Sequence, residues 1–155
     1  MKKIFKKDFV NKNLVKIIVS LILFMAIIIY SIFTYHNYRS MQNAVQTTLE
    51  SINSAHNKSF SSINSDPFGV HLEKNEIIIF SGENYYTNNS LNEIFPIKNG
   101  ASISNVVLNG ISSNSGDISF QKITGIPNKT GNINITVGNK TKVININSIG
   151  LANMN

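Results

Sequence analysis

Hydrophobic and polar residues alternate near the C-terminal end of the chain, in the stretch GNINITVGNKTKVININSIG. The apolar positions lie two apart and are Ile133, Ile135 and Val137 in the first arm, then Ile144 and Ile146 in the second. A period of two places such residues on one face of a strand. Gly138-Asn139 between the arms tolerates the positive φ of a tight reversal. The pattern predicts a β-hairpin whose isoleucine face must be covered by another element.

Between residues 35 and 62 the apolar spacing changes to three and four, which predicts an amphipathic helix. Its apolar stripe is formed by Met41, Val45, Leu49 and Ile52. We expect this stripe to pack on the isoleucine face of the hairpin, because the two apolar surfaces can leave water together. No proline or glycine separates the segment from the apolar run before it, so a single long helix is predicted.

After a break at Asp66-Pro67, short runs rich in Ile, Val and Phe follow, bounded by Gly, Asn and Ser. The runs are GVHLE, EIIIF, SISNVVLN, DISFQ and the two arms of the hairpin. Such runs are typical of strands, and residues 82–100 between them are expected to form a long loop. The predicted fold class is α+β: an N-terminal transmembrane helix continues as an amphipathic helix, which packs on a small antiparallel β-sheet. About four to six strands are expected.

Residues 17–33 read IIVSLILFMAIIIYSIF, without one charged side chain. Extended to Leu14 and Thr34, the run reaches the length of about 20 residues with which a helix crosses the hydrocarbon of a bilayer. A buried core helix is one alternative, but the remaining residues could not enclose so uniformly apolar a segment. A cleaved secretory signal is another, but its apolar region would be shorter, and no Ala-x-Ala site follows here. The expected organisation is a basic N-terminus (1–13), a transmembrane helix (14–34), an amphipathic helix (35–62) and an antiparallel β domain (63–155).

The formal net charge of +6 is concentrated before the apolar run. The first sixteen residues contain six lysines and one aspartate, and Lys12 and Lys16 are expected at the membrane edge. Only Arg39 follows soon after the run. This asymmetry predicts a single-pass protein of the cytoplasmic (inner) membrane, with a cytoplasmic N-terminus and an extracytoplasmic C-terminal domain. Charge placed in this way does not indicate a nucleic-acid partner.

Residue types that carry catalysis show no motif. Cysteine is absent, the three histidines are widely separated, and no serine has the surroundings of a nucleophile. No glycine-rich phosphate loop opens a helix. We therefore expect no enzymatic activity, no cofactor and no metal. Oxygen atoms of Asp66, Glu83 or loop asparagines are an alternative, as ligands of Ca²⁺.

The order of elements resembles that of type IV pilins and of the pseudopilins of type II secretion. The C-terminal part of the chain resembles the closing pattern of minor pseudopilins of the GspH/FimT type. The matching residues are Ile118-Ser119-Phe120, Gly125, Gly131 to Ile135, Ile144-Asn145-Ile146 and Gly150. YRSMQNAVQTTLESINSAHNKS is similar to the helix that follows the membrane in that family, and Phe68-Gly69-Val70 to its first strand. The resemblance implies a non-enzymatic subunit whose N-terminal helix lies in the membrane or packs against other pilin-like subunits.

The N-terminus departs from the prepilin pattern. When DFVNKNLVKIIVSL is aligned with that pattern, Asp8 replaces the glycine of the peptidase site, Phe9 matches the phenylalanine, and Asn13 replaces the glutamate. In the family that glutamate is thought to neutralise the N-terminal amine of a neighbouring subunit. With these substitutions, the resemblance implies an uncleaved subunit that acts at the base of a filament, near an assembly platform in the inner membrane.

The expected function is that of a minor pseudopilin, in which the segment 82–100 and the C-terminal hairpin present the recognition surface. The alternative is a stand-alone membrane-anchored binding domain that holds an extracytoplasmic ligand or DNA on the same scaffold. Lys140 and Lys142 at the hairpin turn, with Lys122 and Lys129, are a candidate basic patch for it. A solvated turn that discourages pairing of sheet edges is the favoured interpretation of these lysines.

Overall fold

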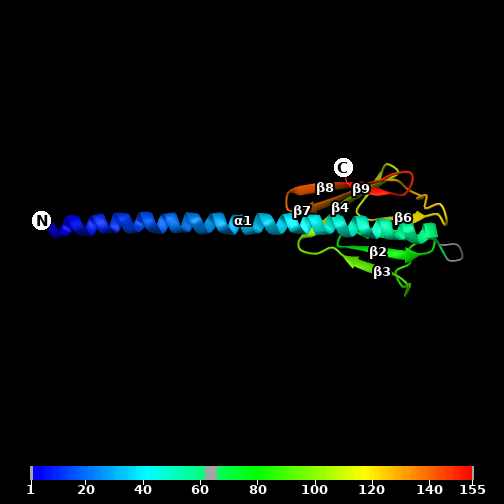
Figure 1. Ribbon diagram of the computed structural model, residues 1–155, viewed down its shortest axis with the longest axis horizontal. Helices are drawn as coiled ribbons and strands as arrows, with labels where there is room; N and C mark the ends of the chain where they lie inside the picture. The colour runs from blue at the N-terminus through cyan, green and yellow to red at the C-terminus, as the bar shows by residue number, and fades with distance from the viewer. Residues whose placement is uncertain (1, 62–65, 155) are drawn as a thin grey trace. The chain divides into compact units, whose positions relative to one another are not determined.

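The computed structural model describes residues 2–61 and 66–154, with side chains from Lys12 onward. In the described residues one helix, α1 (Lys2–Ser61), is followed by nine strands (Figure 1). The chain forms two compact units, Met1–His36 and Asn37–Asn155, and α1 contributes to both. The second unit contains all the strands and is called the β domain below.

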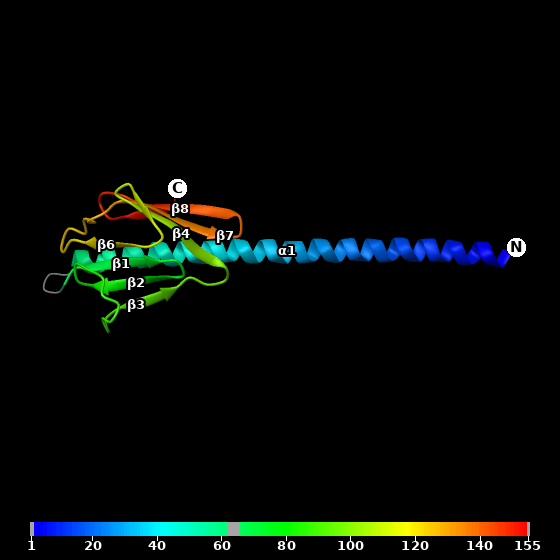
Figure 2. The ribbon, with the colours of Figure 1, turned by 180° about the vertical axis from the view of Figure 1, so that it is seen from behind.

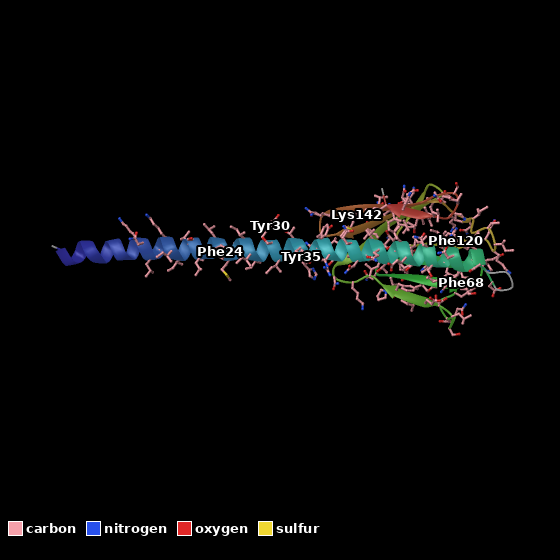
Figure 3. All side chains as sticks on the ribbon, viewed as in Figure 1. Phe24, Tyr30, Tyr35, Phe68, Phe120 and Lys142 are labelled. Atoms are coloured by element: carbon pink, nitrogen blue, oxygen red, sulfur yellow. The ribbon has the colours of Figure 1, made fainter. Side chains whose placement is uncertain are left out.

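α1 forms as one helix because no proline or glycine interrupts its sequence. From Lys12 onward it contains a run long and apolar enough to cross a membrane, and none of that run is buried inside the protein. Phe24 and Tyr30 of the run stand out from the helix (Figure 3). The predicted single helix is confirmed. It ends at Ser61, and the boundary predicted between residues 62 and 63 lies outside the described residues.

The strands form two antiparallel sheets, one with the order β3-β2-β1-β6 and the other with the order β5-β4-β7-β8-β9. The strands are β1 (Phe68–Glu73), β2 (Glu76–Ser81), β3 (Glu93–Pro96), β4 (Ala101–Leu108), β5 (Ile111–Ser113), β6 (Gly116–Phe120), β7 (Gly131–Val137), β8 (Lys140–Ile146) and β9 (Ala152–Met154). The α+β fold class is confirmed. The prediction of a single sheet of four to six strands is wrong, because it combined two sheets and missed three short strands.

The missed strands β3, β5 and β9 each lie at the edge of a sheet. β3 falls within residues 82–100, which were expected to form a loop, and it pairs with β2 from Glu76↔Pro96 to Ile79↔Glu93. None of its side chains is fully buried, so it lacks the alternation that marks a half-buried strand. β5 and β9 contain three residues each. Their neighbours impose the extended conformation through backbone hydrogen bonds, which a local pattern does not record.

The hairpin of β7 and β8 has the predicted form. The two strands pair from Gly131↔Ile146 to Val137↔Lys140 around the turn Gly138-Asn139. Gly138 adopts a φ of 58°, in the left-handed region that a residue with a Cβ occupies at a cost.

α1 and both sheets share one hydrophobic core. From α1, Met41, Val45 and Ile52 are buried in this core, and Leu49 is partly buried against it. The buried residues of the hairpin are Ile133, Ile135, Val137, Ile144 and Ile146. α1 lies in front of the sheets in Figure 1 and behind them in Figure 2, so both sheets of the β domain cover the same side of its helix.

Candidate interaction surface

The last turn of α1 is joined to the loop that follows β6. The backbone N–H of Ile123 donates a hydrogen bond to the carbonyl oxygen of Ser59, with 3.0 Å between the nitrogen and the oxygen. Within the loop, Gln121 N donates to Ile126 O at 2.8 Å, and Gly125 N donates to Gln121 O at 2.9 Å. These bonds close the loop on itself and fix it to the helix.

Ile123 occupies a strained position in this loop, with a φ of 68°. A β-branched residue is rare in the left-handed region, because its Cβ crowds the backbone, and such strain costs about 1–3 kcal/mol. The side chain is 59% exposed, so burial within this chain does little to offset the strain. The backbone geometry of the loop therefore holds an apolar side chain outward at a cost in stability.

Replacing this residue should stabilise the β domain. We expect Ile123→Asn to raise the free energy of unfolding by about 1 kcal/mol, because asparagine tolerates the left-handed region. Thermal unfolding of the full chain in detergent, followed by circular dichroism, would show the gain as a rise of roughly 4 °C. Ile126→Asn is the matched control, since Ile126 is an exposed isoleucine of the same loop that is not among the positive-φ residues. An equal change in the melting temperature of both variants would show that backbone strain at Ile123 is not the cause.

His56 on α1 is the point where two loops meet. Its ring lies edge-on to Phe120, with the ring centroids 5.6 Å apart and the planes at 89°. A Cβ at Gly125 would lie 2.5 Å from Nε2 of this ring, and a Cβ at Gly150 would lie 2.6 Å from its Cδ2. Both glycines also have a positive φ, 67° at Gly125 and 86° at Gly150. Glycine at both positions lets the loops that follow β6 and β8 approach the histidine.

Exposed apolar side chains gather on these two loops and on the end of α1. Phe60 is 58% exposed, and its ring stacks on that of His56 with the centroids 6.4 Å apart. We call this set the apolar loop surface; it consists of Phe60, Ile123, Ile126, Ile149 and Leu151. Clusters of exposed apolar side chains often mark contacts with other proteins. Sequence reasoning missed this surface, because its members come from three segments without a shared period.

A cleft of about 490 Å³ opens between the start of β1 and the end of β6. Its lining residues are Pro67, Glu83, Asn84, Ser119, Phe120, Gln121, Lys122 and Asn128. Two of the lining residues are joined by a pair of hydrogen bonds: Asn128 Oδ1 accepts one from Ser119 N, and Asn128 N donates one to Ser119 O. The side chains that line it offer hydrogen bonds and two opposite charges, but no activated nucleophile.

Asp66 and Glu83, the carboxylates of the alternative Ca²⁺ site, each adjoin one of two hydrogen-bonded residues, since Gly82 N donates to Pro67 O at 2.7 Å. Glu83 lines the cleft, whereas Asp66 is not among its lining residues. Among the described residues, no group of three or more His, Asp or Glu side chains is arranged to hold a metal ion.

A cluster of charged and aromatic side chains surrounds His71 in β1. Its Nδ1 lies against Asp117 of β6, and its Nε2 is 2.9 Å from Glu73 Oε1. The ring of Tyr85 stacks on the imidazole, with the centroids 4.0 Å apart. The strand register explains the cluster, because His71 pairs directly with Asp117 and lies two residues from Glu73 on the same face. Each partner holds the imidazole in place, and the cluster contains no residue for it to activate.

The recognition surface expected from the sequence is divided between the two ends of the β domain. Gly82 N bonds to Pro67 O near the end of α1, whereas Ala101, just after Gly100, pairs with Val137 beside the hairpin turn. The segment 82–100 thus runs from one end of the domain to the other. Its first part and the hairpin turn are far apart.

The four lysines considered as one basic patch are separated in the same way. Lys122 lines the cleft, and Lys129 precedes β7 at its Gly131 end. Lys140 and Lys142 lie in β8 opposite Val137 and Ile135, which at about 3.3 Å per residue are roughly 20 and 13 Å from Gly131 along β7. Figure 3 shows Phe68 and Phe120 near the end of α1, and Lys142 toward the opposite end of the domain.

The positions aligned with the prepilin motif lie in α1. Lys12, Asn13 and Lys16 are exposed on the helix. The side chains of Asp8 and Phe9 lie outside the described residues.

Comparison of the chain with protein-family models, with curated proteins and with solved structures gives no match.

Proposed function

We propose that this protein is a non-enzymatic, membrane-anchored pilin-like subunit, a minor pseudopilin of a type IV pilus or of a type II secretion pseudopilus. The observation that carries the proposal is α1, which is apolar enough to cross a membrane in its first half and packs on antiparallel sheets in its second half. Such a helix can lie in the bilayer or against the helices of other subunits. The lysines before the apolar run favour a cytoplasmic N-terminus and an extracytoplasmic β domain.

The glycines of the pseudopilin-like pattern support the proposal, because each has a structural role in this fold. Gly125 and Gly150 make room for the ring of His56. Gly131 brings its backbone against Val107, where an added Cβ would lie 1.8 Å from the carbonyl oxygen. The spacing of these residues along the chain thus follows from how the C-terminal strands close onto α1.

In this function the apolar loop surface contacts a neighbouring pilin-like subunit. The chain has no cysteine, so Ile149→Cys creates a unique site for a crosslinker. We expect crosslinking of membranes that carry this variant to yield an adduct with another single-pass protein that has a pilin-like N-terminal helix, identified by mass spectrometry. Asn139→Cys, an exposed position at the hairpin turn, is the control and should give no such adduct. A chain that stays monomeric and uncrosslinked in its native membrane would refute the proposal.

We predict that the N-terminus is not processed at Asp8–Phe9. A prepilin peptidase meets a glycine at this position in the family, whereas Asp8 places a carboxylate beside the bond. The lysines before the span would then remain in the cytoplasm, and drawing them through the bilayer is costly, which favours a position at the base of a filament. Intact-mass measurement of the membrane-extracted protein tests this. A species that begins at Phe9 with a methylated amine would contradict it.

The second candidate function is a stand-alone anchored domain that binds DNA through Lys140 and Lys142. The exposed position of Lys140 beside the hairpin turn, with the partly buried Lys142 two residues further along β8, favours it. Retention of the protein on immobilised DNA should then fall as salt rises, because each phosphate contact releases counterions. Lys140→Glu/Lys142→Glu should abolish that retention, and Lys122→Glu/Lys129→Glu should leave it unchanged. Retention that does not respond to salt would exclude this function.

A further inference from the structure

Lysines and no carboxylate lie in or directly beside two neighbouring turns of the β domain. Lys98 lies in the turn of residues 97–100, and Lys140 and Lys142 lie at the start of β8, just after the turn Gly138-Asn139. Ala101 joins the turns, because its N–H donates to Lys98 O at 3.3 Å and it pairs with Val137. We call Lys98, Lys140 and Lys142 the basic turn surface.

This surface lies at the end of the β domain where its part of α1 begins. Ile97, Ala101 and Val137, which flank the two turns, belong to the core that α1 shares with both sheets. Figure 2 shows the turn between β7 and β8 at this end of the domain. The apolar run ends at Thr34, and the β domain begins at Asn37. The chain itself therefore keeps this end within a few residues of the membrane.

We infer that the basic turn surface binds anionic lipid headgroups of the membrane that α1 crosses. The inference rests on the membrane anchor of the proposed function. Lysines close to an anionic bilayer each favour the surface-bound state by about fivefold. The residues between them are small or polar (Asn99, Gly100, Gly138, Asn139), and none of the large exposed apolar side chains of the described chain lies in either turn. Contact at the depth of the headgroups suits such turns better than insertion into the hydrocarbon.

Nucleic acid fits this surface less well. Proteins that hold single strands interleave their basic residues with aromatic side chains on which bases stack. Neither turn contains an aromatic residue. Binding to headgroups requires only the positive charge of the lysines. Because the apolar run of α1 belongs to the same chain, the headgroups are present at high local concentration.

The test uses the full chain reconstituted into vesicles of phosphatidylcholine alone, or of an equal mixture of phosphatidylcholine and phosphatidylglycerol. Asn99→Cys provides a unique, exposed labelling site beside Lys98, since the chain has no cysteine. A fluorophore on this cysteine is quenched by lipids with a nitroxide at the headgroup. We expect stronger quenching in the mixed vesicles than in phosphatidylcholine, and a loss of the difference at high salt.

Charge reversal at two places distinguishes an effect of the basic turn surface from an effect of the protein's net charge. Lys140→Glu/Lys142→Glu should shift the equilibrium away from the lipid by about 25-fold or more, because two favourable charges become unfavourable. Lys122→Glu/Lys129→Glu changes the net charge equally at the other end of the domain and should leave the quenching unchanged. A fluorophore on Thr124→Cys, in the loop after β6, should report no dependence on lipid composition.

The outcomes distinguish the inference from the proposed function. Equal quenching in the two kinds of vesicle, with the chain resistant to extraction by alkaline carbonate, overturns the inference and leaves the anchor intact. Extraction of the chain by carbonate overturns the anchor and the inference together. A third outcome assigns the surface to nucleic acid. In it, quenching does not depend on phosphatidylglycerol, and retention of the protein on DNA requires Lys140 and Lys142.

Discussion

Ile135→Asp should unfold the β domain. Ile135 is 0% exposed in β7, between Ile103 of β4 and Lys142 of β8 in the sheet. A carboxylate at this buried position must lose its hydration, which costs several kcal/mol even beside a lysine such as Lys142 and is a large part of the roughly 5–15 kcal/mol that stabilises a small domain. Thermal unfolding of the full chain in detergent, with limited proteolysis, should show a protease-sensitive β domain without a cooperative transition, while α1 keeps part of its circular dichroism.

Asn134→Asp is the matched control on the neighbouring residue. Asn134 lies on the opposite face of β7 and is only partly buried, so its new charge remains hydrated. The variant should melt within a few degrees of the unsubstituted protein. Equal melting temperatures for Ile135→Asp and Asn134→Asp would show that the two faces of the hairpin are assigned wrongly.

Gly131→Ala should destabilise the β domain almost as strongly, although it adds only one methyl group. The added Cβ would lie 1.8 Å from Val107 O and 3.1 Å from Leu108 Cα, and both are backbone atoms of β4. The clash cannot be relieved by a side-chain rotation, because β4 and β7 are paired here through Leu108↔Gly131. We expect a loss of about 3 kcal/mol or more, the upper end of what overpacking usually costs. Chemical denaturation followed by circular dichroism would measure it.

Gly138→Ala is the control that measures the cost of a positive φ without a steric clash. Gly138 also has a positive φ, but no atom lies within 4 Å of the position its Cβ would take. The substitution should therefore cost only the left-handed backbone penalty, about 1–2 kcal/mol. If the two alanine variants lose the same stability, the close approach of β7 to β4 is not what requires glycine at position 131.

The helix and the hairpin were predictable from the sequence because each repeats its pattern over many residues. α1 has no helix-breaking residue, and the spacing of Met41, Val45 and Ile52 marks its packed face. The hairpin alternates over both arms, and its turn has glycine at the position that needs a positive φ. In both elements the local preference and the tertiary contacts agree, which is what makes a pattern informative.

The division into two sheets could not be predicted in the same way. β1 and β4 belong to different sheets, although the backbone N–H of Ile103 donates to Lys74 O at 2.9 Å where the sheets meet. Which strand pairs with which is decided by contacts between residues distant in the chain. The short edge strands depend even more on their neighbours, since their own residues bury little.

The candidate interaction surface was only partly accessible to sequence reasoning. Gly125 and Gly150 belong to the pseudopilin-like pattern, but the sequence does not show that both lie against His56. The missing information was the path of the chain, which brings the loops after β6 and β8 to the same ring. The positive φ of Ile123 leaves no trace in composition, because isoleucine is the residue least expected there.

The hydrogen bonds at Ser59 determine how the β domain should respond to a mechanical load. Ser59 Oγ accepts from Phe68 N at 2.7 Å and donates to Phe68 O at 3.1 Å, while the serine carbonyl accepts from Ile123. A tensile force that enters the domain along α1 reaches this turn only after it has sheared the helix against both sheets. A force applied at the C-terminus instead peels β9 from β8, where three residue pairs break one after another. We therefore expect the domain to resist a force along the axis of its helix better than a force applied at its C-terminus.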